Sequence, residues 1–113
     1  MEMIVHLDGD IFDIVKSGSK DVEIRLNDEK RRQLKVGDTL VFLRRPDDVE
    51  SIKATITNLV YLNSFEDVFN SYEMKRVYLE NTSKDDYINL MKRFYSDEEV
   101  SKYGVLAIEF KLD

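Results

Sequence analysis

Apolar and polar residues alternate along several stretches of the chain, with the period of two that is typical of strands with one buried face. In the segment KDVEIRL, which begins at Lys20, apolar side chains alternate with charged ones, so Glu23 and Arg25 share the opposite face. The turn residues Asn27 and Asp28 end this predicted strand. Similar patterns predict four more strands, over Met3–Leu7, Thr39–Leu43, Ser51–Leu62 and Val105–Leu112.

Between these strands, apolar residues recur three and four positions apart, which is typical of helices. This spacing predicts a short helix over Ile11–Ser17, with Asp10 as its N-cap and Gly18 just after its end. Phe94 lies on the apolar stripe of a later helix and is predicted to be part of the core. Glu73–Leu79 shows no clear pattern. Three further helices are predicted to begin where a Ser precedes an acidic residue by three positions, at Ser64 and Asp67, Ser83 and Asp86, and Ser96 and Glu99.

About five strands and three or four short helices indicate an α+β fold, with a small mixed or antiparallel barrel-like sheet flanked by the helices. The turn around Pro46, followed by two Asp residues, predicts a hairpin between the strands on either side of it. The 113 residues are enough for one core, so residues 1–113 are expected to form a single domain. A hydrophobic content of 42% indicates a globular rather than a disordered chain.

The residue types present exclude several kinds of site. The chain has no Cys, which excludes disulfides, thiolate catalysis and cysteine metal sites. His6 is the only histidine, and one histidine cannot supply the usual zinc ligands, so we expect no metal and no cofactor. His6 itself is expected to be a partly buried polar residue. The N-terminal residues are acidic, unlike a secretion signal, and no apolar run approaches the roughly 20 residues of a membrane helix, so we expect a cytoplasmic protein with no membrane partner.

The net charge of −6 argues against broad attraction to nucleic acid, but the charge is unevenly distributed. Residues 1–45 hold nine Lys or Arg and nine Asp or Glu, so the whole excess of acidic residues lies in 46–113. A locally basic site is therefore compatible with an acidic protein. The candidate phosphate contacts are Lys30, Arg31, Arg32 and Lys35, with Arg44 and Arg45 extending the patch, although such runs in loops are often only solvated.

The charged face of the Lys20–Leu26 strand predicts the floor of a cleft. Arg25 suits an anion, since its planar guanidinium donates two parallel hydrogen bonds, while Lys20 meets the Glu23 carboxylate. In a hydrolase, Glu23 or a neutral Lys20 would take a proton from water, which requires a shifted pKa. The alternative is a solvated ion pair across the strand surface, worth roughly 0–1 kcal/mol.

The stretches FDIVKSGSKDVEIRLNDEKRRQLKVGDTLVF and YGVLAIEFKL, with a helix ending in Phe-Tyr-Ser between them, resemble an ASCH domain of the PUA-like superfold. The resemblance implies a small β-barrel flanked by helices, with a cleft that binds RNA or a nucleotide. Its most specific part is a Gly-x-Lys-x-x-Glu-x-Arg motif at Gly18, Lys20, Glu23 and Arg25, followed by a Gly-Asp turn at Gly37 and Asp38.

One enzymatic branch of this family, the bacterial 4-acetylcytidine amidohydrolases, implies an alternative function. These enzymes use a Lys, a Thr three residues later and a distant Glu to hydrolyse an amide on a nucleoside. The resemblance places the Lys at Lys20 and the acid at Glu80, whereas Glu23 stands at the position of the Thr. A small nucleoside amidohydrolase with Lys20, Glu23 and Glu80 as catalytic residues is thus the alternative to a binding protein.

The leading hypothesis is a binding protein for RNA or a nucleotide-like ligand, with Lys20, Glu23 and Arg25 around the cleft and Lys30 and Arg31 on phosphates. RNA-binding surfaces also stack unpaired bases on aromatic side chains. Tyr95, one position away from the apolar stripe, is predicted to face the cleft, and Tyr103 either stacks on a base or packs at a helix end. A third possibility is a protein-interaction module that uses the acidic second half of the chain.

Overall fold

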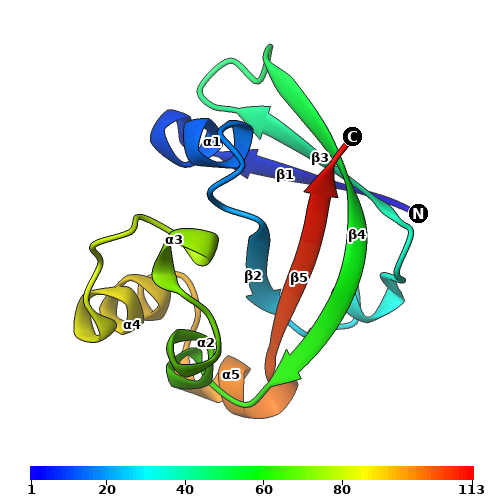
Figure 1. Cartoon of the computed structure of the whole chain (residues 1–113). Helices are drawn as coiled ribbons and strands as arrows, with labels where there is room; N and C mark the ends of the chain where they lie inside the picture. Colours follow the sequence, from blue (N-terminus) through cyan, green and yellow to red (C-terminus); the bar gives the residue numbers. More distant parts are fainter.

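The computed structural model describes residues 1–113 and shows a five-stranded sheet that curls into a half barrel, with five short helices around it (Figure 1). The strand order is β1-β3-β4-β5-β2; β1 and β3 are parallel and the other neighbours are antiparallel. The strands are β1 (Glu2–Leu7), β2 (Val22–Leu26), β3 (Thr39–Arg44), β4 (Ser51–Leu62) and β5 (Val105–Leu112). The helices are α1 (Gly9–Lys16), α2 (Phe65–Ser71), α3 (Met74–Val77), α4 (Lys84–Lys92) and α5 (Asp97–Tyr103), with a 3-10 turn at Arg31–Gln33.

The long strand β4 connects the two halves of the sheet. Its first half pairs with β3 and its second half runs along β5, and the register with β5 shifts by one residue between Ile56 and Asn58. An extra residue of this kind bends a strand and increases its twist. The sheet therefore curls, and its two edge strands, β1 and β2, contribute side chains to one shared cavity.

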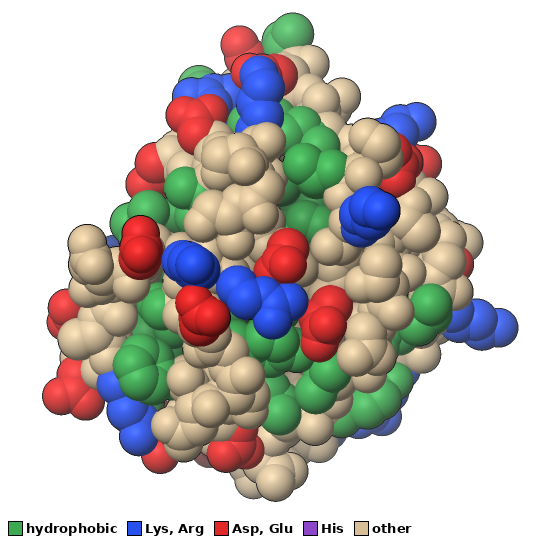
Figure 2. All heavy atoms as spheres, viewed as in Figure 1, with side chains coloured by type: hydrophobic (Ala, Val, Ile, Leu, Met, Phe, Trp, Pro, Cys, Tyr) green, Lys and Arg blue, Asp and Glu red, His purple; other side chains and the backbone are tan.

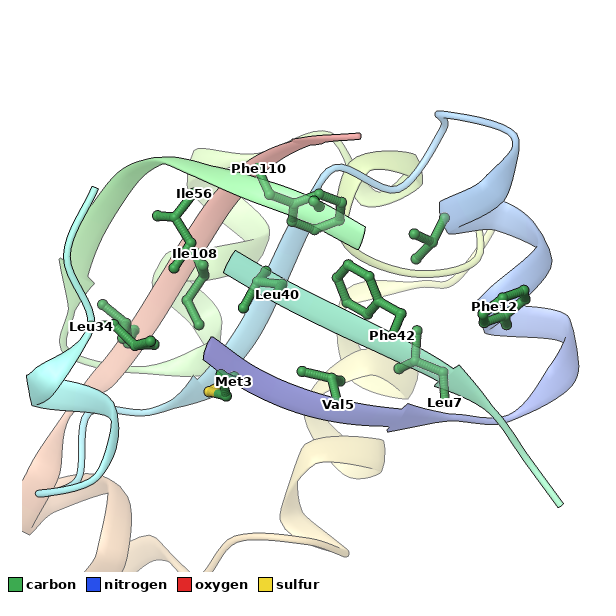
Figure 3. Close-up of a cluster of buried hydrophobic side chains, with 13 residues drawn as sticks. Met3, Val5, Leu7, Phe12, Leu34, Leu40, Phe42, Ile56, Ile108 and Phe110 are labelled. Atoms are coloured by element: carbon green, nitrogen blue, oxygen red, sulfur yellow. The ribbon is translucent and has the colours of Figure 1, made fainter. Parts of the chain in front are cut away.

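Apolar side chains from β1, β3, β4 and β5 fill the concave side of the sheet, together with side chains from α1 (Figure 3). At the centre, the rings of Phe42 and Phe110 lie 4.9 Å apart between centroids. Burial of one large apolar side chain contributes roughly 1.5–3 kcal/mol, so this interior cluster is a main source of stability. Its buried members are Met3, Val5, Leu7, Phe12, Val15, Leu34, Leu40, Phe42, Ala54, Ile56, Leu106, Ile108 and Phe110.

A second apolar cluster lies on the opposite face of β2 and β5, beneath α2, α3 and α4. Val22 and Ile24 of β2 pack there against Phe65, Val77 and Tyr87 from the helices. Strand β5 is consequently buried on both faces: its first four residues all lie in one core or the other. An apolar run without polar alternation is typical of such a doubly covered strand.

The α+β fold with five strands, predicted from the sequence, is confirmed, and the unassigned stretch after Tyr72 contains α3. Three local predictions are wrong. His6, expected to be partly buried, is exposed. Helix α1 begins at Gly9 with Asp8 as its N-cap, and Asp10 lies in its first turn. Phe94 is 67% exposed, because α4 ends at Lys92 and the helical spacing no longer holds beyond it. None of the helices is long and apolar enough to cross a membrane.

Candidate functional site

The pairing of β2 with β5 determines where the charged side chains of β2 point. Glu23 is opposite Ile108 and Arg25 is opposite Leu106, and both of these β5 residues belong to the interior core. Directly opposed residues of an antiparallel pair lie on the same face of the sheet. Glu23 and Arg25 therefore face the concave side of the half barrel, whereas the apolar face of β2 packs under the helices.

Lys20, Glu23 and Arg25 form one connected network. Glu23 Oε1 accepts a hydrogen bond from Lys20 Nζ at 3.1 Å, and Glu23 Oε2 accepts one from Arg25 Nη2 at 3.0 Å. Lys20 Nζ also donates to the backbone carbonyls of Val22 at 2.8 Å and Val77 at 2.7 Å. Lys20 is only 3% exposed and Glu23 only 5%. The alternative interpretation, a solvated ion pair on the strand surface, is therefore wrong, because this network is internal.

The burial of these groups is compensated by their opposite charges. Burial alone would raise the pKa of Glu23, but the charges of Lys20 and Arg25 outweigh it and hold this pKa below its ordinary value. Burial would likewise lower the pKa of Arg25, but the Glu23 carboxylate raises it overall. Glu23 is thus an ionised carboxylate at neutral pH that accepts hydrogen bonds, and it is a weak general base.

Acid should destabilise the protein through Glu23. Because its pKa is lower in the folded state, the stability that this ionised carboxylate contributes is present above about pH 4.3, the ordinary Glu value, and is lost as the pH falls through the lower folded pKa. Urea unfolding of the wild type and Glu23→Gln at pH 7, 5, 4 and 3 tests this. We expect the wild type to be more stable at pH 7 and the difference to shrink towards pH 3. An equal difference at pH 7 and pH 3 would contradict it.

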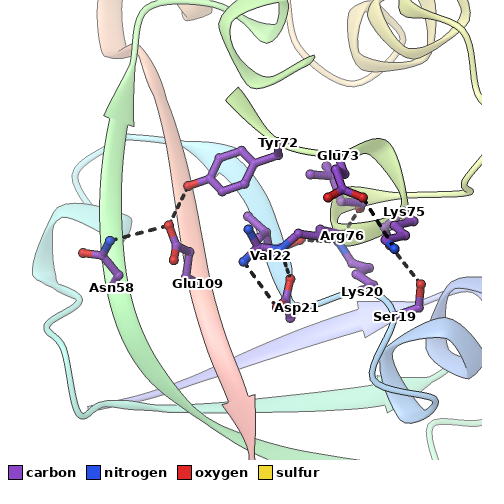
Figure 4. A network of polar contacts seen from close by, with 11 residues as sticks. Ser19, Lys20, Asp21, Val22, Asn58, Tyr72, Glu73, Lys75, Arg76 and Glu109 are labelled. Carbon is purple, nitrogen blue, oxygen red and sulfur yellow. Dashed lines mark hydrogen bonds and ion pairs between the residues drawn. The ribbon is translucent and has the colours of Figure 1, made fainter. Parts of the chain in front are cut away.

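Helix α3 is fixed over Lys20 by polar contacts on the outer side of the sheet (Figure 4). Arg76 donates to both carboxylate oxygens of Asp21, at 2.8 and 3.3 Å, and its carbonyl accepts from the Asp21 amide at 3.0 Å. Tyr72 donates to Glu109 of β5 at 2.8 Å. These contacts hold the Val77 carbonyl where Lys20 reaches it. Acidic and basic side chains are interspersed on this outer face (Figure 2).

A cavity of about 340 Å³, here called the motif cavity, opens beside the network. Arg25 Nε and the Tyr87 hydroxyl are buried and have no hydrogen-bond partner, and both residues line this cavity. Burial raises the pKa of Tyr87, and the negative charge of Glu23 raises it further, so its hydroxyl keeps its proton. Besides the motif residues, the aromatic side chains Tyr78, Tyr87, Phe94 and Tyr95 contribute to the lining.

Several other candidate residues lie apart from the motif cavity. Lys30 and Arg31 line an adjacent groove on the β1 side. Tyr103 lies in a separate hollow at the end of α5, with the Lys102 ammonium 5.1 Å from its ring. Glu80 is exposed and lines another hollow, between α3 and α4, which does not include Lys20. Arg44 is turned towards α1, where it pairs with Asp13. No group of three or more His, Cys, Asp or Glu side chains could hold a metal ion.

The cavity also contains residues that the sequence pattern assigned to other roles. Tyr87 belongs to the apolar stripe of α4 and is buried in the outer core, yet it also lines the cavity. Arg45 and His6 line both the cavity and the adjacent groove, because the end of β1 and the turn after β3 lie together. The sequence gives little indication that Tyr87 belongs to the site, because a single Tyr on an apolar stripe is equally compatible with a core position.

Comparisons with known proteins agree with this architecture. Residues 5–113 match the ASCH domain family. The crystal structure of hypothetical protein PH0355 superposes with a TM-score of 0.86 at 29% identity over 100% of both chains. The solution structure of protein PF0455 from Pyrococcus furiosus gives a TM-score of 0.77 at 32% identity, covering 99% of this chain and 97% of that one. No curated protein matches. The chain belongs to the ASCH domain family.

Proposed function

We propose that this ASCH protein binds RNA or a nucleotide-like ligand in the motif cavity, with Lys20, Glu23 and Arg25 as the polar floor of the site. The ASCH family is generally linked to RNA binding, which supports this class of ligand. The observation that carries the proposal is that two residues lining the cavity, Arg25 and Tyr87, each have a buried polar atom without a partner, Nε and the hydroxyl. Buried polar groups normally have partners, and a ligand would supply them.

The size and lining of the cavity suit a nucleobase. A volume of about 340 Å³ lies within the range of roughly 300–1,000 Å³ that is usual for small-molecule sites. A base presents a flat aromatic surface and an edge of hydrogen-bond donors and acceptors, and proteins bind it by stacking and by edge contacts. Phe94, exposed at the cavity, offers a stacking surface, while Arg25 and Tyr87 offer donors to the edge.

The charges around the cavity favour a neutral group within it. Three basic side chains in the lining, Lys20, Arg25 and Arg45, are matched by three acidic ones, Asp8, Asp10 and Glu23. Two of these cations are also already paired with Glu23. The third cation, Arg45, forms no ion pair, but neither do the two acids Asp8 and Asp10, so a buried phosphate would meet a negative balance, whereas an uncharged base needs no counter-charge.

The amidohydrolase alternative is not favoured by the geometry. Lys20 donates to three oxygen atoms, one of them the ionised Glu23 carboxylate. A Lys ammonium held in this way does not act as a neutral base. Glu80, the acid implied by the resemblance, lines a different hollow.

Titration of isotope-labelled protein with nucleosides and short single-stranded RNAs, followed by NMR chemical shifts, tests the binding proposal. We expect shifts centred on Lys20, Glu23 and Arg25. In Tyr87→Phe, the loss of one hydrogen bond to the ligand should weaken binding about tenfold. Its stability should be unchanged or slightly higher, because the hydroxyl has no partner in the free protein.

The matched control is Tyr61→Phe, which removes a hydroxyl from a 63% exposed side chain outside the cavity and should bind like the wild type. Arg25→Lys retains the charge opposite Glu23 but loses the planar guanidinium, so it should also weaken binding. If neither nucleosides nor RNAs shift the cavity resonances of the folded wild type, the proposal is wrong.

A further inference from the structure

A second hollow, here called the basic groove, runs along the outer edge of β1 and has a volume of about 460 Å³. Its charged lining differs from that of the motif cavity, because four basic side chains face a single acidic one, Glu2. An excess of positive charge in a concave surface attracts anions. The basic side chains of the groove are Arg25, Lys30, Arg31 and Arg45.

Part of this positive charge is not neutralised within the protein. Lys30 and Arg45 form no ion pair. Arg31 donates from Nη1 to Asp28 at 3.0 Å, but its Nε is buried without a partner, as is Arg25 Nε. Each of these two arginines is therefore held by a carboxylate, Glu23 or Asp28, and retains one donor, its Nε, that no group of the protein accepts. Such donors match the oxygens of a phosphate.

The basic groove adjoins the motif cavity, since His6, Arg25 and Arg45 line both. A ligand that fills the cavity with a base can therefore extend past Arg25 into the groove. The charge changes along this path from balanced to strongly positive. A nucleotide has the same arrangement, with an uncharged base on one side of the sugar and an anionic phosphate on the other.

We infer that the ligand unit is a nucleotide of single-stranded RNA, with its base in the motif cavity and an adjoining phosphate in the basic groove, bound by Arg25, Arg31 and Lys30. This inference rests on the proposed function and adds a binding site for the phosphate of the ligand. A base enters the cavity only when unstacked, which favours single strands over duplexes. The groove then distinguishes nucleotides from free nucleosides, since only nucleotides carry the phosphate.

Calorimetric titration of the wild type with each of the four ribonucleosides, with their 5′- and 3′-monophosphates and with RNA trinucleotides tests the inference. We expect one monophosphate series, and the trinucleotides, to bind about tenfold or more tightly than the nucleosides, as for one charge-assisted hydrogen bond to a phosphate. The 5′ and 3′ series show on which side of the sugar the groove lies.

The variant Lys30→Gln/Arg31→Gln should lose the extra affinity that the phosphate gives, here called the phosphate increment. Its affinity for nucleosides should stay unchanged. The Arg31 amide, which also donates to Asp28, is retained in it. The control Lys35→Gln/Lys53→Gln removes the same charge from two exposed side chains outside both hollows and should retain the increment. For the RNA, the slope of log affinity against log salt should also fall in magnitude by about 0.7 for each phosphate that the variant no longer neutralises.

The possible failures are distinguishable. If nucleosides bind at the cavity but their phosphates add nothing, or if both double variants lose the increment equally, the groove inference is overturned and the proposed function stands. If no nucleoside, nucleotide or RNA binds, the proposed function itself fails. Equal binding of an Asp-rich hexapeptide and the trinucleotides in the groove would also overturn the assignment to phosphate.

Discussion

Lys20→Met is expected to lower the free energy of unfolding by about 3–5 kcal/mol, the usual cost of removing one partner from a buried ion pair. The variant leaves the Glu23 carboxylate, 5% exposed, with Arg25 as its only cation. It also removes the donor from the Val22 and Val77 carbonyls. Since small domains are stable by only about 5–15 kcal/mol, the loss should be evident as a lower urea midpoint with an unchanged m-value.

The matched control is Lys16→Met, which breaks the exposed pair between Lys16 and Glu50 at 2.9 Å. It should cost only about 0–1 kcal/mol, because solvent screens this pair. The double variant Lys20→Met/Glu23→Leu should recover part of the loss, since it no longer leaves a buried carboxylate unpaired. Equal costs for Lys20→Met and Lys16→Met would contradict the prediction that burial makes the loss of Lys20 costly.

Phe42→Ala is expected to cost about 3–5 kcal/mol, the range for deletion of a buried aromatic side chain. Phe42 has no exposed surface and packs against Phe110 at the centre of the interior core. Its removal leaves a cavity between β3 and β5 that the curled sheet can fill only by moving several strands together. Urea unfolding followed by circular dichroism measures the effect.

Phe94→Ala is the control with the same chemical change. Because Phe94 is 67% exposed, the free energy of unfolding of this variant should differ from that of the wild type by no more than about 0.5 kcal/mol. Ligand binding should weaken if this ring stacks on a base. A cost near that of Phe42→Ala would mean that Phe94 is packed in the folded protein. The pair of variants thus separates the core from the rim of the motif cavity.

The sequence pattern by itself determined the strands, most of the helices and the family. The alternation in β2 is a local property of that strand, and it sufficed to place Glu23 and Arg25 on one face. Capping residues at Ser64, Ser83 and Ser96 likewise marked helix starts through hydrogen bonds that span only three residues. Signals of this range do not depend on the rest of the fold.

Only the tertiary structure decided what the charged face of β2 meets. Two faces of a strand are distinguishable in sequence, but which neighbour covers each depends on residues far along the chain, such as Val77 and Ile108. The curl of the sheet turns this face inward and buries the Lys20–Glu23 pair, although charged residues are usually exposed.

Tertiary packing likewise determined which of the candidate residues lie together and which lie apart. The turn after β3 brings Arg45 beside His6 and Arg25, whereas Glu80 and Tyr103 lie in other hollows. No spacing along the chain encodes these distances, because they follow from strand order and from the packing of α3 and α4 on β2. The sequence therefore identified the motif and its chemistry, and the fold determined which side chains share a site with it.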